Sequence, residues 1–421
     1  MLTKEYKRIK YGCYAGNICM AITSTLSPLL FVTFNTKYGI SYSLLGFLVL
    51  INFSTQLIID LIFTAYSHKF NIEKAVKNIP LIFIFGLIFY TVFPLVFQNF
   101  AYLGLLIGTV IFSASSGLAE VLLSPVVAAL PSEFPDKELS KLHSAYAWGV
   151  VLVVIISTIF FVLFSTDNWY FLILILSVLP LISFVLFFGC TFPVINNAEK
   201  VTGIAPLIKN KTLWLGVAAI FLGGSSEVAM AQWSSSYLEE AMQIPKAFGD
   251  LFGVAFFAVM LGLGRTLYSK YGKDIRPVLL YGTLSATICY LVVVFSGNAI
   301  VCLIACGLTG FCVAMLWPGN LILMSEHFPK AGVALFALMA AGGDLGASVG
   351  PQLMGILTDF ALTNSYLINL ATNLGIETSE FSMRFGMFFL SFFPLAGVGI
   401  YLILNKKSVE KKLTHFDKEK I

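Results

Sequence analysis

Three acidic residues lie inside long apolar stretches of the sequence, where a carboxylate is unusual. From Asn78 to Ala119 the chain has no Asp, Glu, Lys or Arg, and Glu120 then follows with apolar neighbours on both sides. Glu227 lies in GGSSEVAMAQWSS, and Asp344 lies in AAGGDLGASVGP. A charge at the centre of a membrane helix costs roughly 2.5–3.5 kcal/mol on insertion scales. If these stretches cross a membrane, the three acids are candidate binding groups.

Glu120 precedes Pro125 by five residues, in the second half of its apolar stretch. A proline removes one helical hydrogen bond and bends the helix, which can turn this face toward a cavity. There the carboxylate could hold a proton, bond to a sugar hydroxyl, or do both in turn. The alternative is a neutral acid that hydrogen-bonds a neighbouring helix.

The stretch around Glu227 combines glycines and serines with Gln232 and Trp233. Glu227, Met230 and Ser234 share one helical face by their i, i+3, i+7 spacing. Hydroxyls, an amide and a tryptophan suit a sugar-like ligand, which has polar edges and an apolar face. Trp233 could equally anchor the helix at the membrane interface.

Asp344 lies among Gly342, Gly346 and Gly350, which repeat every four residues and indicate a helix face for close packing. Pro351 then bends this helix. Asp344 could bind a coupling ion. It could instead satisfy freed backbone amides or pair with another helix.

Seven further residues are candidates for weaker reasons. Five uncharged groups could line a polar cavity, although each alone could be a helix-packing residue: Asn17, Asn52, Gln56, Trp317 and Asn320. Trp317 and Asn320 flank Pro318. Asp60 and Arg265 lie nearer the ends of their apolar stretches and are interpreted as gate or packing charges.

Composition predicts an integral membrane protein. The chain has 421 residues, of which 58% are hydrophobic and 11% charged. Uniformly apolar runs of about 20 residues are membrane helices, whereas a barrel would alternate polar and apolar residues. We therefore predict an all-α integral membrane fold with twelve transmembrane helices, at roughly 11–34, 42–63, 79–98, 101–126, 142–164, 169–192, 211–236, 249–270, 276–296, 299–324, 331–359 and 382–404.

Little of the chain remains outside these spans, so we expect no soluble catalytic domain and no enzyme activity. No nucleophile–base pair appears, and we expect no cofactor. The seven cysteines lie in or beside spans without a CxxC pair and are interpreted as apolar packing residues. The four histidines fall in loops, at their edges or in the tail, so we expect no metal site.

Lysine and arginine predict the orientation. Most of the 26 basic residues fall on the side of the membrane that holds both termini, which indicates cytoplasmic termini of a multi-pass cell-membrane protein. The net charge of +4 then reflects topology and not a nucleic-acid partner. The lipid bilayer is the expected surrounding, and we expect a monomer.

The sequence also repeats. SGLAEVLLSPVVAAL, from residue 116, resembles TGFCVAMLWPGNLIL, from residue 309, and matches Gly117 to Gly310 and Pro125 to Pro318. A second match links TAYSHKFNI, from residue 64, to TLYSKYGKDI, from residue 266. Both matches lie six spans apart and predict two pseudo-symmetric six-helix halves, 1–192 and 211–421, joined by a cytoplasmic linker at 193–210. Substrate sites in such folds lie near the midplane, between the halves.

These motifs resemble those of the major facilitator superfamily, and in particular the fucose permease family of proton-coupled sugar symporters. The similar motifs are E-x-x-x-S-P at Glu120–Pro125, GR at 264–265, SEHFP at 325–329 and the GG…GP…G run at 342–355. The resemblance implies that Glu120 helps to bind sugar and couple it to protons. Ser124 stands where the family has asparagine, and the family's acid in span 1 has no counterpart in AITSTLSP. Glu227, in the repeat partner of span 1, could have taken over that charge.

The resemblance and the residues together favour a secondary transporter that works by alternating access. The predicted function is uptake of a small polar metabolite, with a monosaccharide as the favoured substrate, coupled to H⁺ or Na⁺. One alternative is proton-driven export of an amphipathic compound or drug, since buried acids and 39 phenylalanines suit a hydrophobic cation. The other is a membrane sensor that keeps the fold without transporting.

Overall fold

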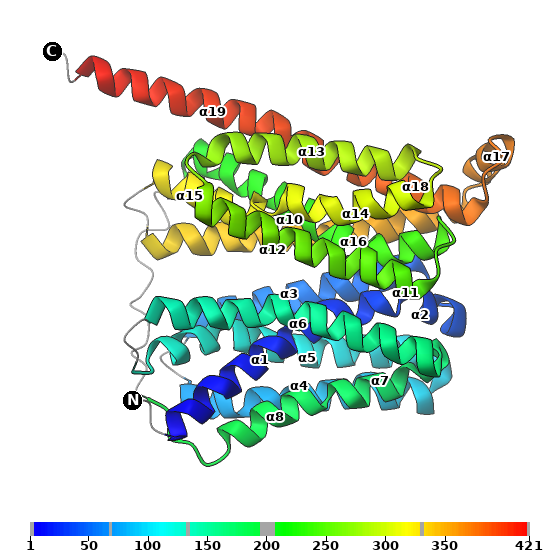
Figure 1. Ribbon diagram of the computed structural model, residues 1–421, viewed down its shortest axis with the longest axis horizontal. Helices are drawn as coiled ribbons and strands as arrows, with labels where there is room; N and C mark the ends of the chain where they lie inside the picture. Colours follow the sequence, from blue (N-terminus) through cyan, green and yellow to red (C-terminus); the bar gives the residue numbers. More distant parts are fainter. Residues whose placement is uncertain (1–3, 67–69, 132–134, 194–206, 329–331, 419–421) are drawn as a thin grey trace. The chain divides into compact units, whose positions relative to one another are not determined.

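The computed structural model describes residues 4–66, 70–131, 135–193, 207–328 and 332–418 (Figure 1). The described residues form helices and contain no β-strand, which confirms the predicted all-α class. Within the described ranges, ten helices are long and apolar enough to cross a membrane, or eleven if the bent pair α1 (Lys4–Leu29) and α2 (Phe31–Tyr38) is one span. Each of the twelve predicted spans has a helix at its position.

Contacts divide the chain into two compact units. Unit 1 consists of Met1–Lys200 with Ile244–Ala255, and unit 2 of Val201–Gln243 with Phe256–Ile421. Most of the predicted linker, residues 194–206, lies outside the described residues.

Unit 1 contains α1, α2 and the following helices: α3 (Tyr42–Tyr66), α4 (Ile72–Val96), η2 (Gln98–Phe100), α5 (Ala101–Ala128), α6 (Pro135–Phe164), η3 (Thr166–Asn168), α7 (Trp169–Leu176), α8 (Val178–Phe187), α11 (Lys246–Phe248) and η4 (Gly249–Ala255). Unit 2 contains α10 (Lys211–Glu240), α12 (Phe256–Tyr271), α13 (Ile275–Phe295), α14 (Ala299–Val313), α15 (Leu316–His327), α16 (Gly332–Thr363), α17 (Ser365–Asn373), α18 (Thr378–Leu390) and α19 (Phe392–Lys418).

Polar caps define where several of these helices begin. Five helices follow an Asn or Asp whose side chain accepts a backbone N–H of the first turn, namely Asn71, Asn210, Asp274, Asn298 and Asn364. Such caps satisfy N–H groups that have no partner within the helix. They fix where each of these five helices begins.

Prolines divide three of the spans into two helices. The breaks lie at Ser177, at Ala314–Met315 and at Ser391. A proline follows each break within a few residues, at Pro180, Pro318 and Pro394. Proline has no N–H to donate and its ring clashes with the preceding turn, so each span bends at this point.

Glycines allow the closest helix contacts in each unit. An ideal Cβ built on Gly108 of α5 would lie 2.5 Å from Tyr90 Cβ of α4. In unit 2, one on Gly350 of α16 would lie 2.8 Å from the Ser225 carbonyl oxygen of α10, and one on Gly346 would lie closer still to the Phe221 carbonyl oxygen. The predicted packing face of α16 is therefore confirmed, with α10 as its partner.

A buried ion pair lies at the start of the eighth span. Lys246 Nζ is 3.2 Å from Asp250 Oδ1, and the Asp250 side chain is fully buried. Lys246 also lies over the ring of Phe161 in α6. Asp250 belongs to η4, a π-helix of seven residues. This whole segment belongs to unit 1, whereas the rest of its span belongs to unit 2.

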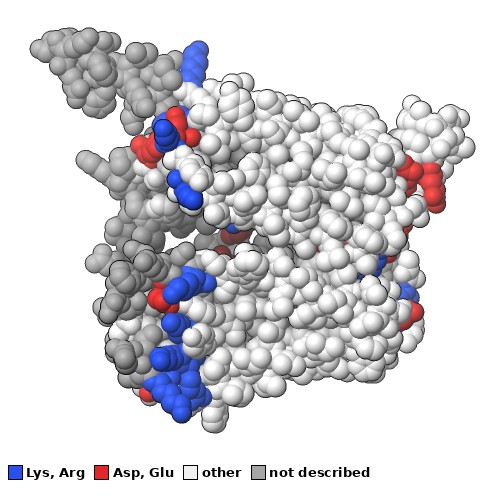
Figure 2. Space-filling view, in the orientation of Figure 1, with Lys and Arg blue, Asp and Glu red and all other residues white. Residues whose placement is uncertain are grey.

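Basic side chains of unit 1 gather at one end of its helices, where α1 begins (Figure 2). There Glu138 of α6 joins three donors. It accepts from Lys141 Nζ at 2.8 Å and Tyr14 Oη at 2.9 Å, and Lys10 Nζ lies at 3.2 Å. The hydrogen bonds from Lys141 and Tyr14, with Lys10 behind them, lower the pKa of the Glu138 carboxyl to about 2. This cluster ties α1 to α6 outside the membrane-spanning stretch.

Candidate functional site

Unit 1 carries a layer of polar side chains between α3 and α5. Asn52 Oδ1 accepts hydrogen bonds from Gln56 Nε2 at 2.9 Å and from Ser113 Oγ at 2.7 Å. Gly117 lets the helices approach, since an ideal Cβ there would lie 3.1 Å from Gln56 Cα. Hydrogen bonds between polar groups stabilise helix pairs inside a membrane.

Glu120 lies one turn beyond this layer on α5. Its side chain is exposed and makes no hydrogen bond or ion pair with any described residue. A carboxylate facing lipid at this depth would cost roughly 2.5–3.5 kcal/mol, so an exposed one requires water or a ligand. Continuing the α3–α5 register by one turn brings Asp60 level with the residue after Glu120. Asp60 itself is half-buried.

Asn17 of α1 lies elsewhere in unit 1. Its side chain is 7% exposed, and its Nδ2 donates to the Leu142 carbonyl of α6 at 2.5 Å. The structure therefore places Asn17 in the contact between α1 and α6, away from the Asn52 layer.

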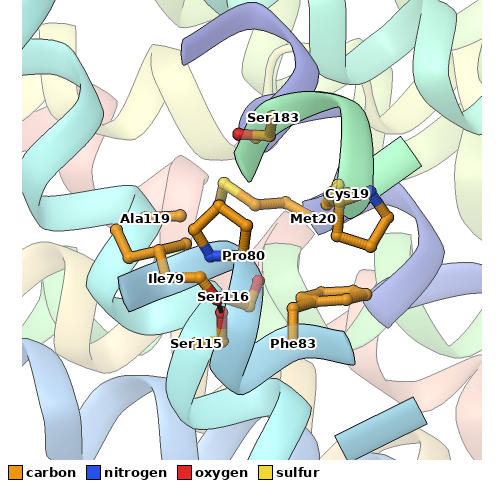
Figure 3. Close-up of a pocket in the computed structure, with 11 residues that line it drawn as sticks. Cys19, Met20, Ile79, Pro80, Phe83, Ser115, Ser116, Ala119 and Ser183 are labelled. Carbon is orange, nitrogen blue, oxygen red and sulfur yellow. Dashed lines mark hydrogen bonds between the residues drawn. The ribbon is translucent and has the colours of Figure 1, made fainter. Parts of the chain in front are cut away.

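A small cavity lies in unit 1 among α1, α4, α5 and α8 (Figure 3). Its volume is about 10 Å³ of space for the centre of a water molecule, which is room for one water. Ser116 lines it with a buried hydroxyl that has no partner among the described residues. Ser115 and Ser183 also line it, but their hydroxyls donate to the Ile79 and Gly12 carbonyls. The cavity is too small for a metabolite.

Unit 2 contains an ion pair between two of the predicted residues. Arg265 Nη2 of α12 donates to Glu227 of α10, at 3.2 Å from Oε1 and 3.5 Å from Oε2. Arg265 Nε donates to the Ala314 carbonyl at 3.1 Å. The Glu227 side chain is 14% exposed, whereas the Arg265 side chain is 44% exposed. One edge of the guanidinium is therefore held by the protein, and part of the side chain is open.

An aromatic ring lies beside this pair. An ideal Cβ on Gly343 of α16 would lie 2.5 Å from Trp317 Cη2, and one on Gly224 of α10 would lie 3.3 Å from Trp317 Cζ3. The indole of Trp317 thus rests on two glycines, and it stays half-buried. Gly224 stands one helical turn before Glu227. Asp344, also half-buried, directly follows Gly343.

Two other predicted residues of unit 2 lie in its interior. Asn320 is fully buried and donates from Nδ2 to Tyr401 Oη at 2.7 Å and to the Leu316 carbonyl at 2.5 Å. Gln232 is 6% exposed. Its neighbour Trp233 is completely buried and donates from Nε1 to the Pro351 carbonyl at 3.0 Å. Trp233 is therefore a packing residue of α10 and α16, not an interfacial anchor.

The structure thus brings Glu227, Arg265 and Trp317 together, with Asp344 nearby in the chain. Sequence reasoning did not find that Arg265 is the partner of Glu227, nor did it single out Asp250. The spacing Lys246-x-x-x-Asp250 beside an apolar run was the available signal for that second pair, because side chains four residues apart meet on a helix.

A carboxylate, a guanidinium and an aromatic face form a set with defined chemistry. The two charged groups can exchange hydrogen bonds with several hydroxyls, and an indole face can cover an apolar ring surface. The pair can also gain or lose a proton at the carboxylate, which would change the charge of the site by one.

A solved D-xylose-proton symporter has a TM-score of 0.75 and 17% identity, over 94% of this chain and 96% of that one. The inward-open xylose transporter XylE from E. coli has a TM-score of 0.71 and 16% identity, over 95% and 96%. The nucleoside transporter NupG has a TM-score of 0.72 and 11% identity, over 96% and 100%. At these identities the likeness shows the fold.

No curated protein sequence matches the chain. The sequence model of a transporter family, described as the Major Facilitator Superfamily, matches residues 13–351, which is most of the chain. The chain therefore belongs to the Major Facilitator Superfamily.

Proposed function

We propose that this transporter takes up a monosaccharide together with H⁺ or Na⁺ by alternating access. The observation that carries the proposal is the group formed by Glu227, Arg265 and Trp317 in unit 2. Trp317 lies on Gly343 and Gly224 with part of its ring open, and Arg265 is 44% exposed beside it. A sugar needs both an apolar platform and several polar partners, and this group supplies both.

Glu120 in unit 1 is the second proposed contributor to substrate and ion binding. It is exposed without a partner in the described part of the chain, so it is free to take a proton, a hydroxyl or an ion. Asp344 is proposed to contribute to ion binding. The D-xylose-proton symporter among the similar structures has the same fold, and its name is compatible with a sugar and a proton as the pair transported.

The test is counterflow of labelled monosaccharides in proteoliposomes of the purified protein. Counterflow is chosen because it detects electroneutral as well as electrogenic transport. Trp317→Ala should raise KM for the accepted sugar several-fold. The matched control is Trp148→Ala, since Trp148 is 72% exposed on α6 of unit 1 and is not one of the three residues grouped in unit 2. Its KM should equal that of the wild type.

A second measurement identifies the coupling ion. Sugar-evoked current is recorded with and without Na⁺, and with an imposed pH gradient. Current that needs Na⁺ assigns sodium, and current that follows the pH gradient assigns the proton. The proposal fails if no monosaccharide gives counterflow. Extrusion of cationic dyes by the same vesicles would then favour the export function, and ligand binding without counterflow would favour a sensor.

A further inference from the structure

A proline and an arginine meet at one carbonyl oxygen in unit 2. In an α-helix, the carbonyl of residue i accepts from the N–H of residue i+4. The residue four positions after Ala314 is Pro318, which has no N–H. The ladder resumes one residue later, where Gly319 N donates to the Met315 carbonyl at 2.8 Å. The Ala314 carbonyl therefore lacks its i+4 donor in the helix.

Arg265 donates to this carbonyl. Its Nε donates to the Ala314 carbonyl at 3.1 Å, while its Nη2 donates to Glu227 Oε1 at 3.2 Å. Gly264 makes the approach of α12 possible, because an ideal Cβ there would lie 2.6 Å from Ala314 Cβ. A guanidinium is planar and its donors are fixed relative to one another. Anchoring Nε therefore sets the direction in which Nη2 meets Glu227.

We propose that Pro318 is a positioning residue for the site. By denying a helical partner to the Ala314 carbonyl, it gives Arg265 a fixed second contact and so orients the guanidinium toward Glu227. This inference rests on the proposed function only for the purpose of the oriented pair, which is to bind the transported sugar. The orientation itself is a property of the three helices, and it can be measured without transport.

The alternative role for Pro318 is to bend the span and nothing more. The two roles differ in what happens when the N–H is restored. Pro318→Ala adds a backbone N–H at position 318, which can donate the helical hydrogen bond to the Ala314 carbonyl. That N–H then competes with Arg265 Nε for the same oxygen. A proline that acts only through the bend would leave Arg265 attached whenever the bend is kept.

The first experiment measures the reactivity of Arg265 toward an arginine-selective dicarbonyl reagent, by mass spectrometry of the labelled peptide. The variants are Pro318→Ala and Pro318→Gly, the second of which restores the N–H while tolerating a bend. The matched control is Pro394→Ala. Pro394 follows a break in the same way at Ser391, but it does not stand opposite the carbonyl that Arg265 uses.

In both Pro318 variants the reagent should label Arg265 about tenfold faster than in the wild type, because the hydrogen bond from the charged guanidinium to the Ala314 carbonyl is lost. In Pro394→Ala the reagent should label Arg265 at the wild-type rate. Labelling within twofold of the wild type in both Pro318 variants would overturn the proposal. An equal rise in Pro394→Ala would also overturn it, since the cause would then be general loosening of the helices.

The second experiment uses transport and separates the two proposals. If Pro318 acts through Arg265, then adding Pro318→Ala to Arg265→Lys should leave KM for the sugar unchanged, although each single change raises it. Additive increases in KM would contradict a role through Arg265. Absence of monosaccharide transport in the wild type would bear on the proposed function alone, because the labelling result still decides the positioning.

Discussion

Gly343→Ala tests whether the Trp317 ring must lie where the structure places it. An ideal Cβ at position 343 would lie 2.5 Å from Trp317 Cη2 and 2.8 Å from Cζ2 and Cζ3. Carbon atoms pack best at about 3.5–4.0 Å, so the ring must retreat from α16 by about 1 Å. Overpacking of this kind costs about 1–3 kcal/mol of stability.

The effect on binding follows from the same displacement. A well-placed aromatic contact contributes about 0.5–1.5 kcal/mol beyond the area it buries, taking aromatic pairs as the guide. Losing it raises KM about twofold to tenfold, since 1.4 kcal/mol corresponds to a factor of ten. The assay is counterflow of the accepted sugar, with thermal unfolding measured in parallel.

Gly262→Ala is the matched control for this change. Gly262 lies on α12 near Arg265, and a Cβ there would meet nothing within 4 Å. Its KM and thermal stability should both stay at the wild-type values. The reasoning is refuted if Gly343→Ala keeps the wild-type KM while Trp317→Ala raises it, because the ring would then serve the sugar without needing its seat on Gly343.

Three further predictions follow from the ionisable groups. Glu120→Gln should abolish sugar accumulation driven by a pH gradient while counterflow persists, and retained accumulation would exclude Glu120 from coupling. Glu138 has a pKa lowered to about 2, so its contribution to stability is present above the ordinary value of 4.5 and is lost as the pH falls from there toward 2. Thermal unfolding should therefore separate the wild type from Glu138→Gln more at pH 5 than at pH 3, and an equal separation would contradict this. Lys246→Met should cost about 3–5 kcal/mol, because it takes the ammonium from the buried Asp250 carboxylate; adding Asp250→Asn should recover part of that loss, and no recovery would show that the pair is not the cause.

Much of the fold could be predicted because the dominant signal is local. A run of apolar residues long enough to cross the bilayer must be a helix, since lipid offers no partner for its backbone. The glycine spacing at 342, 346 and 350 likewise predicted a packing face, and the structure shows α10 lying against it. The boundary between the two sequence halves stays a prediction. The halves are continuous stretches of sequence, whereas the contact units are not, because unit 1 also includes residues 244–255.

The candidate site was less predictable because it depends on which helix faces meet. Glu227 and Arg265 were each singled out as charges in apolar surroundings, but 38 residues separate them, and no spacing rule links α10 to α12. Asn17 and Asn320 have the composition of cavity residues, yet their amides are held by backbone and tyrosine partners. Only three-dimensional contacts distinguish a polar group held in packing from one left open.

The short segment that contains Lys246 and Asp250 has a consequence for how the chain is made. Residues 1–200 of unit 1 are synthesised first. The remaining segment of unit 1, Ile244–Ala255, is synthesised only after the first helix of unit 2. At 5–20 residues per second, the ribosome needs about 3–11 s to extend the chain by the roughly 55 residues after Lys200. During that interval the face of α6 that later contacts Lys246 and Val254 lacks the segment 244–255 as a partner. A chain stopped at residue 200 would therefore lack the segment Ile244–Ala255 that belongs to unit 1.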